Sequence, residues 1–76
     1  MRDLLEIIVK ALVDHPDQVE VKETEEGGSV TFELHVAPSD IGKVIGRQGR
    51  VVKAIRTVMK AAAIRDNKRV SVEVLG

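Results

Sequence analysis

The chain has 76 residues, 43% of them hydrophobic and 32% charged, with a formal net charge of zero and no cysteine. This length predicts one domain, residues 1–76, with a modest core, and the lack of cysteine excludes disulfides, thiolate nucleophiles and thiolate metal sites. No apolar run has the length of a membrane span, and the N-terminus lacks the signal-peptide pattern, so we expect a cytoplasmic protein.

The first predicted element is a helix over residues 3–14. Its apolar residues recur at the spacing of one helix face, as a core stripe requires: Leu5, Ile8, Val9 and Leu12. Asp3 followed by Glu6 resembles a capping box at the start of this helix. Pro16 disfavours helical geometry at His15, which predicts the helix end there.

Two strands are predicted next. Residues 19–22 and 30–36 alternate apolar and polar side chains, and this period of two places one face of each strand on a core. The sequence Glu25-Glu26-Gly27-Gly28 between them predicts a hairpin turn, because glycine adopts positive φ without steric cost. The acidic side chains on this hairpin are interpreted as a solvated edge that discourages pairing with other strands.

The second half of the chain predicts two helices and a strand. Pro38 ends the second strand, and Ser39 is expected to cap a short helix that runs through Ile45. A longer helix is expected over residues 49–65. The last predicted strand rests on the alternation of three apolar residues with polar ones: Val70, Val72 and Val74. The element order is therefore α-β-β-α-α-β.

Charge is divided between the two halves of the chain. Residues 1–40 hold three Lys or Arg and ten Asp or Glu, which leaves a formal charge of −7, whereas residues 41–76 hold nine and two, which leaves +7. Such a division indicates one basic face directed at a polyanion. Solvated charge that differs by chance between a sheet and its helices would give the same division.

The turn Gly46-Arg47-Gln48-Gly49 joins the two helices with only two residues between its glycines. Gly46 can end one helix with positive φ, and Gly49, which lacks a Cβ, lets another backbone approach the free N–H groups of the next helix. Basic residues surround this opening and make it suitable for a phosphate: Lys43, Arg47, Arg50 and Lys53. Glycines are common at helix–helix turns, so these four residues alone do not identify a binding site.

The longer run Ile41-Gly42-Lys43-Val44-Ile45-Gly46-Arg47-Gln48-Gly49 resembles the I-G-x-x-G-x-x-G signature of KH domains. The element order matches their type II arrangement, and the resemblance covers the whole chain. It is similar to the stand-alone bacterial KH proteins of the KhpA family. The resemblance implies an α+β fold in which three helices pack on one face of a three-stranded mixed sheet.

KH domains hold about four single-stranded nucleotides, and their G-x-x-G turn clamps the backbone. The resemblance therefore implies a single-stranded-RNA-binding protein that acts as an RNA chaperone or post-transcriptional regulator. Carried over by position, the RNA-binding residues are Ile41, Gly42, Lys43, Val44, Ile45, Gly46, Arg47, Gln48, Gly49, Arg50 and Lys53. Gly42 is expected where the helix packs closely, and the apolar members are either base contacts or core. Single-stranded DNA is an alternative ligand.

The helix over residues 49–65 has an apolar arc of roughly 200°, wider than one face of a small core needs. This width indicates either deep burial within one chain or a partner surface. The resemblance to KhpA implies a homodimer, a heterodimer with a larger KhpB-like RNA-binding protein, or both. The residues proposed for a dimer interface are Val52, Ile55, Arg56, Met59 and Ala63. A protein-interaction module with little affinity for nucleic acid is the alternative function.

Other polar residues do not form a catalytic pattern. His15 and His35 lack metal-ligand spacing, and we expect His15 to be exposed or to interact with the helix C-terminus. The sequence contains no Ser-His-Asp order, paired-carboxylate site or nucleotide P-loop. We therefore expect neither an enzyme nor a bound metal or cofactor.

Overall fold

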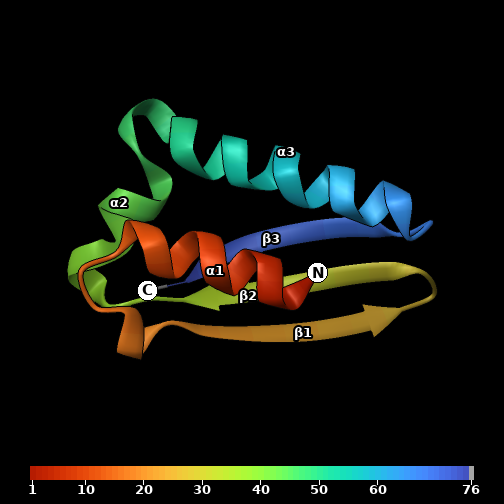
Figure 1. Ribbon diagram of the computed structural model, residues 1–76, viewed down its shortest axis with the longest axis horizontal. Helices are drawn as coiled ribbons and strands as arrows, with labels where there is room; N and C mark the ends of the chain where they lie inside the picture. Colours follow the sequence, from red (N-terminus) through yellow and green to blue (C-terminus); the bar gives the residue numbers. More distant parts are fainter. Residues whose placement is uncertain (76) are drawn as a thin grey trace.

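The computed structural model describes residues 1–75 and shows helices packed over a three-stranded sheet (Figure 1). Short 3-10 turns connect several of its elements. The helices and strands, in chain order, are α1 (Arg2–Leu12), β1 (Glu20–Glu26), β2 (Ser29–His35), α2 (Ile41–Ile45), α3 (Arg50–Arg65) and β3 (Arg69–Leu75). The predicted α+β class and element order are confirmed.

β2 is the central strand of the sheet. It pairs antiparallel with β1 and parallel with β3, so the sheet is mixed. Gly27 and Gly28 form the two-residue hairpin turn with φ of 57° and 82°, the positive values that a tight hairpin needs. A parallel pair requires a crossover connection, and here the crossover consists of α2, the Gly46-Arg47-Gln48-Gly49 turn and α3.

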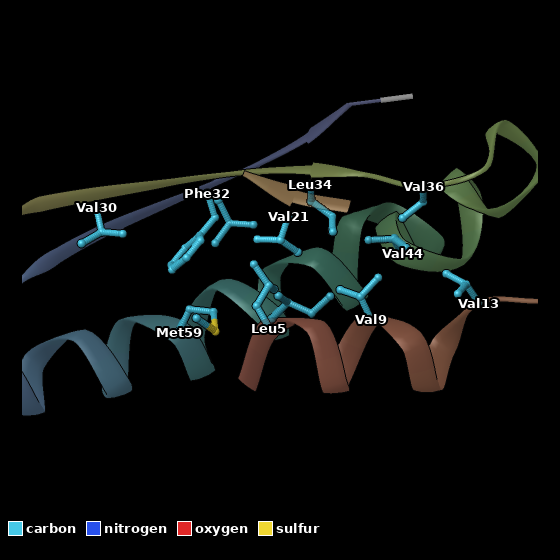
Figure 2. Close-up of a cluster of buried hydrophobic side chains, with 12 residues drawn as sticks. Leu5, Val9, Val13, Val21, Val30, Phe32, Leu34, Val36, Val44 and Met59 are labelled. Carbon is cyan, nitrogen blue, oxygen red and sulfur yellow. The ribbon is translucent and has the colours of Figure 1, made fainter. Parts of the chain in front are cut away.

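The core lies between the sheet and the helices. Figure 2 shows Phe32 and Leu34 of β2 on the sheet side, facing Leu5 and Val9 of α1 and Met59 of α3. All five side chains are 0% exposed. Burying a side chain of this size contributes roughly 1.5–3 kcal/mol. The buried side chains of β2 and α1 therefore hold together the two layers that carry the α2–α3 turn.

Two helix starts differ from the predictions. Asp3 and Glu6 do not form a capping box, because α1 begins at Arg2 and has no side-chain cap; instead the Arg2 Nε donates to Glu6 Oε1 at 3.4 Å. Ser39 does not cap α2. It lies within a 3-10 turn that extends the helix start, so the N-cap position falls to Asp40.

The wide apolar arc of α3 is divided between the sheet and the outer surface. Val58 lies on the outer part and is 44% exposed. Four of the five residues predicted as a dimer interface are buried within this chain instead: Val52, Ile55, Met59 and Ala63. The fifth, Arg56, donates hydrogen bonds to β3. The prediction is therefore wrong for the four apolar positions, because one chain already buries their side chains.

Even α3, the longest helix among residues 1–75, lacks the combination of length and apolar character that a bilayer crossing requires, and so do the others in that range.

Candidate nucleic-acid interface

The turn between α2 and α3 begins at Gly46. Its N–H donates to the carbonyl of Gly42 at 2.8 Å, which ends α2. Gly46 has φ 78° and ψ 172°, and a Cβ at this position would lie 2.9 Å from the backbone nitrogen of Val51. Only glycine satisfies both the dihedral angle and this close approach.

Gln48 and Gly49 complete the reversal with left-handed backbones, at φ 57° and φ 74° respectively. A residue other than glycine in this region costs about 1 kcal/mol or more, so Gln48 is held under local strain. Its Oε1 accepts a 3.4 Å hydrogen bond from Arg50 Nη2. Figure 1 shows this turn at the end of the molecule opposite the β1–β2 hairpin. The turn therefore presents polar side chains beside the first N–H groups of α3, where an anion is favoured.

The structure exposes most of the predicted RNA-binding residues and half-buries four more. The exposed ones are Gly42, Lys43, Arg47, Gln48, Arg50 and Lys53. The half-buried ones are Ile41, Ile45, Gly46 and Gly49. Ten of the eleven therefore have exposed surface, and all ten belong to α2, the α2–α3 turn or the first turn of α3.

Two expectations within this set are wrong. Val44 is 0% exposed because it packs in the core, so its side chain is not available to a base. Gly42 is not a site of close helix packing: a Cβ there would meet no atom within 4 Å. Ile41 and Ile45 remain as the apolar side chains of α2 with exposed surface.

Lys43 is paired with acidic side chains. Its Nζ forms an ion pair with the Asp14 carboxylate and lies 4.0 Å from Asp40 Oδ1. The hydrogen bond to Asp14 raises the pKa of Lys43, so the lysine is cationic at neutral pH. Because both Lys43 and Asp14 are exposed, solvent screens the pair and it contributes little to stability. A phosphate would have to compete with Asp14 for this ammonium group.

Asp40 is a buried carboxylate, 1% exposed, at the start of α2. Its Oδ1 accepts the N–H of Asp14 at 3.1 Å, and its Oδ2 accepts the N–H of His15 at 3.0 Å and lies 3.1 Å from His15 Nδ1. Burial alone opposes ionisation, but these hydrogen bonds outweigh it and hold the pKa of Asp40 below its usual value. These hydrogen bonds connect the segment after α1 to the start of α2. They therefore fix the position of α2, which leads into the turn. No pattern in the sequence pointed to this role.

A groove of about 370 Å³ runs between α3 and the edge strand β3. It is lined by Arg56, Lys60 and residues 70–73. Arg56 donates from Nε and Nη2 to the carbonyl of Val72, at 3.2 and 3.1 Å. Among residues 1–75, β3 pairs with β2 alone, so its other edge is open. The sequence interpretation assigned Arg56 to a partner surface and gave Lys60 no role, because neither belongs to a recognisable motif.

A second hollow of about 300 Å³ lies between α1 and α3, and we call it the α1–α3 seam. Only apolar side chains line it: Ile8, Leu12, Val51, Ala54, Ile55 and Val58. Val51 also contacts Gly46, so the seam adjoins the turn. An apolar patch that stays at the surface is typical of a partner-binding site.

A basic turn framed by two glycines joins two helices within the crossover of a mixed sheet, and the order of elements is α-β-β-α-α-β. These features together define a type II KH domain. Residues 2–74 match the KhpA/KhpB KH-domain family, and the chain belongs to it.

Similar proteins share almost the whole length of the chain. The RNA-binding protein KhpA of Clostridium acetobutylicum is 60% identical over 75 residues, which cover 99% of this chain and 100% of that protein. The protein of the same name from Clostridium perfringens is 57% identical with the same coverage. RNA-binding protein KhpA of Chlamydia trachomatis is 48% identical, and the match covers 99% of this chain and 96% of that protein.

Proposed function

We propose that this chain binds single-stranded RNA by clamping its backbone with the Gly46-Arg47-Gln48-Gly49 turn. The observation that carries the proposal is the geometry of that turn, where two glycines at positive φ present polar side chains beside the start of α3. The relatives named RNA-binding protein KhpA support it. We propose a non-catalytic cytoplasmic protein that acts as an RNA chaperone or post-transcriptional regulator.

The chemistry of the site favours the backbone over the bases. Arg47 and Arg50 supply positive charge at a helix N-terminus, which suits phosphate oxygens. Phe32 is the only aromatic residue and is buried, so bases cannot stack on an aromatic ring. Bases would pack against Ile41 and Ile45 and form hydrogen bonds at their edges. We expect weak affinity from one such module and a steep dependence on salt.

The test is a titration of an eight-nucleotide oligouridylate with the double variant Arg47→Asp, Gln48→Asp. We expect affinity to fall at least about tenfold, because two carboxylates repel the phosphates, while the thermal melt changes little. A control with the same charge change is Gln18→Asp, Lys22→Asp, since both residues are exposed and lie outside the α2–α3 crossover. Unchanged binding in the turn variant, or an equal loss in the control, would contradict the clamp.

The same titration with the matching oligodeoxyuridylate separates RNA from DNA. We expect tighter binding to RNA. Equal affinity for the two oligomers would assign the chain to single-stranded nucleic acid in general, because the 2′-hydroxyl then contributes nothing.

We propose a second function for the α1–α3 seam, as the surface where two KH modules pair. The partner is a second copy of this chain or a KhpB-like RNA-binding protein. The wholly apolar lining supports this role, as does the exposed fraction of Val58. Pairing would place two turns on one RNA and raise the overall affinity without any new RNA contact.

A further inference from the structure

We propose that Asp14 restrains RNA binding by holding Lys43 away from the phosphates, so that Asp14 sets the affinity of the α2–α3 turn. This inference rests on the proposed binding of RNA by that turn. Lys43 lies in the last turn of α2, directly before the glycine-framed turn. Its Nζ forms an ion pair with the carboxylate of Asp14, a residue from the segment that follows α1.

Lys43 differs from the other basic residues around the turn in having acidic partners. The Asp14 carboxylate pairs with it directly, and Asp40 Oδ1 lies 4.0 Å from its Nζ. Two carboxylates thus surround one ammonium group. The other three cations have no acidic partner among residues 1–75: Arg47, Arg50 and Lys53. The turn therefore offers a phosphate three unpaired cations and one that is already neutralised.

The position of Asp14 does not depend on its ion pair with Lys43. The N–H of Asp14 donates to Oδ1 of the buried Asp40 at 3.1 Å, and the N–H of His15 donates to Oδ2 at 3.0 Å. These two hydrogen bonds hold the backbone that carries the Asp14 carboxylate. The ion pair itself is open to solvent, since 68% of the Asp14 side chain is exposed, and it contributes little to stability. An effect on ligand binding therefore explains the pair better than a need of the fold does.

RNA gains little by taking Lys43 from Asp14. A phosphodiester and a carboxylate each carry one negative charge, so the exchange replaces one ion pair by another. It also leaves the Asp14 carboxylate unpaired beside the new phosphate, within the Debye length of about 8 Å at physiological salt. Like charges at that distance repel each other. Removal of the Asp14 charge should therefore release one more cation for the RNA backbone.

The test is a titration of an eight-nucleotide oligouridylate with Asp14→Asn at several salt concentrations. We expect affinity to rise about threefold to fivefold and the salt slope to steepen by about 0.7, the value for one single-strand phosphate contact. The matched control is Asp17→Asn, which removes the same charge from an exposed residue that has no ion pair among residues 1–75. It should change affinity by less than about twofold, because it releases no cation.

The same substitution in a Lys43→Gln background separates the release of Lys43 from a general loss of negative charge. Asp14→Asn then has no lysine to release, so its gain in affinity should fall to that of the Asp17→Asn control. An equal gain with and without Lys43 would overturn the inference, as would an unchanged affinity of Asp14→Asn. A lower melting temperature with no gain in affinity would assign Asp14 a structural role instead.

Failure of the proposed function would give different results. The parent protein and Asp14→Asn would both fail to bind the oligomer, or the Arg47→Asp, Gln48→Asp variant would bind as tightly as the parent. Neither result depends on whether Asp14 pairs with Lys43. The two failures are therefore distinguished by the same set of titrations.

Discussion

Gly46 and Val51 touch across the turn, and a Cβ at Gly46 would lie 2.9 Å from the Val51 backbone nitrogen and nearer still to its side chain. Gly49 has no such neighbour, since a Cβ there meets nothing within 4 Å. Its φ of 74° nevertheless lies in the left-handed region. The two glycines that frame the turn are therefore needed for different physical reasons.

This difference predicts unequal costs of alanine substitution. Gly49→Ala should lower the free energy of unfolding by about 1–2 kcal/mol, the cost of one left-handed residue. Gly46→Ala should cost at least about 1 kcal/mol more, because Val51 must also move. Urea denaturation of both variants measures the difference. Equal losses would show that the Gly46–Val51 contact adds nothing to the cost of Gly46→Ala.

Alanine substitution at Gly42 should change the free energy of unfolding in the opposite direction. It is exposed within α2, and a Cβ there has free space. Gly42→Ala should therefore raise the free energy of unfolding by about 0.5–1 kcal/mol, the helix-propensity difference between the two residues. We expect RNA affinity to fall in the same variant, because the added methyl group occupies surface where the strand approaches. A stabilised variant with unchanged affinity would remove Gly42 from the interface.

Asp40 predicts a loss of stability in acid. Its pKa in the folded protein lies below the usual value, so its contribution is fully present above the unfolded pKa of about 4 and disappears as the pH falls through the lower folded value. Melting temperatures measured from pH 7 to pH 2 should fall in this acid range, and less steeply for Asp40→Asn. At pH 7 the variant should melt several degrees lower, since an amide cannot replace every accepted hydrogen bond. Parallel pH profiles of the two proteins would contradict this assignment.

The α1–α3 seam predicts a change of oligomeric state. Val58→Glu places a charge on the apolar seam and should convert a dimer to a monomer, with little change in the melting temperature because Val58 is already 44% exposed. Thr57→Glu is the matched control, since Thr57 is exposed on α3 and does not line the seam. Sedimentation velocity over a range of concentrations distinguishes the states. A monomeric parent protein at all concentrations would refute pairing through this surface.

The sequence was sufficient for the layers of the fold. Alternation in residues 30–36 placed Phe32 and Leu34 on the core side, and the helical spacing of Leu5 and Val9 placed them opposite. Periodicity has a direct physical meaning in such elements, because each is long enough to repeat its pattern. The positive φ predicted for Gly46 is confirmed, whereas the positive φ of Gly49 was not predicted, since Gly49 was expected only to let another backbone approach.

The remaining features depend on packing that no local pattern contains. α2 has only five residues, too few to show which of Ile41, Val44 and Ile45 faces the core. For α3 the spacing gave the width of the apolar arc, but the sheet decides which part of that arc is buried. Likewise, the burial of Asp40 depends on two N–H groups that are about 25 residues distant in the chain.

The central claim is that the α2–α3 turn clamps single-stranded RNA, and an NMR titration of the parent protein tests it most directly. Amide shifts are followed while an eight-nucleotide oligouridylate is added at low salt. The largest changes should fall on residues 42–53, centred on Arg47 and Gln48. Changes confined to β1 or to the α1–α3 seam, with the turn unaffected, would contradict it.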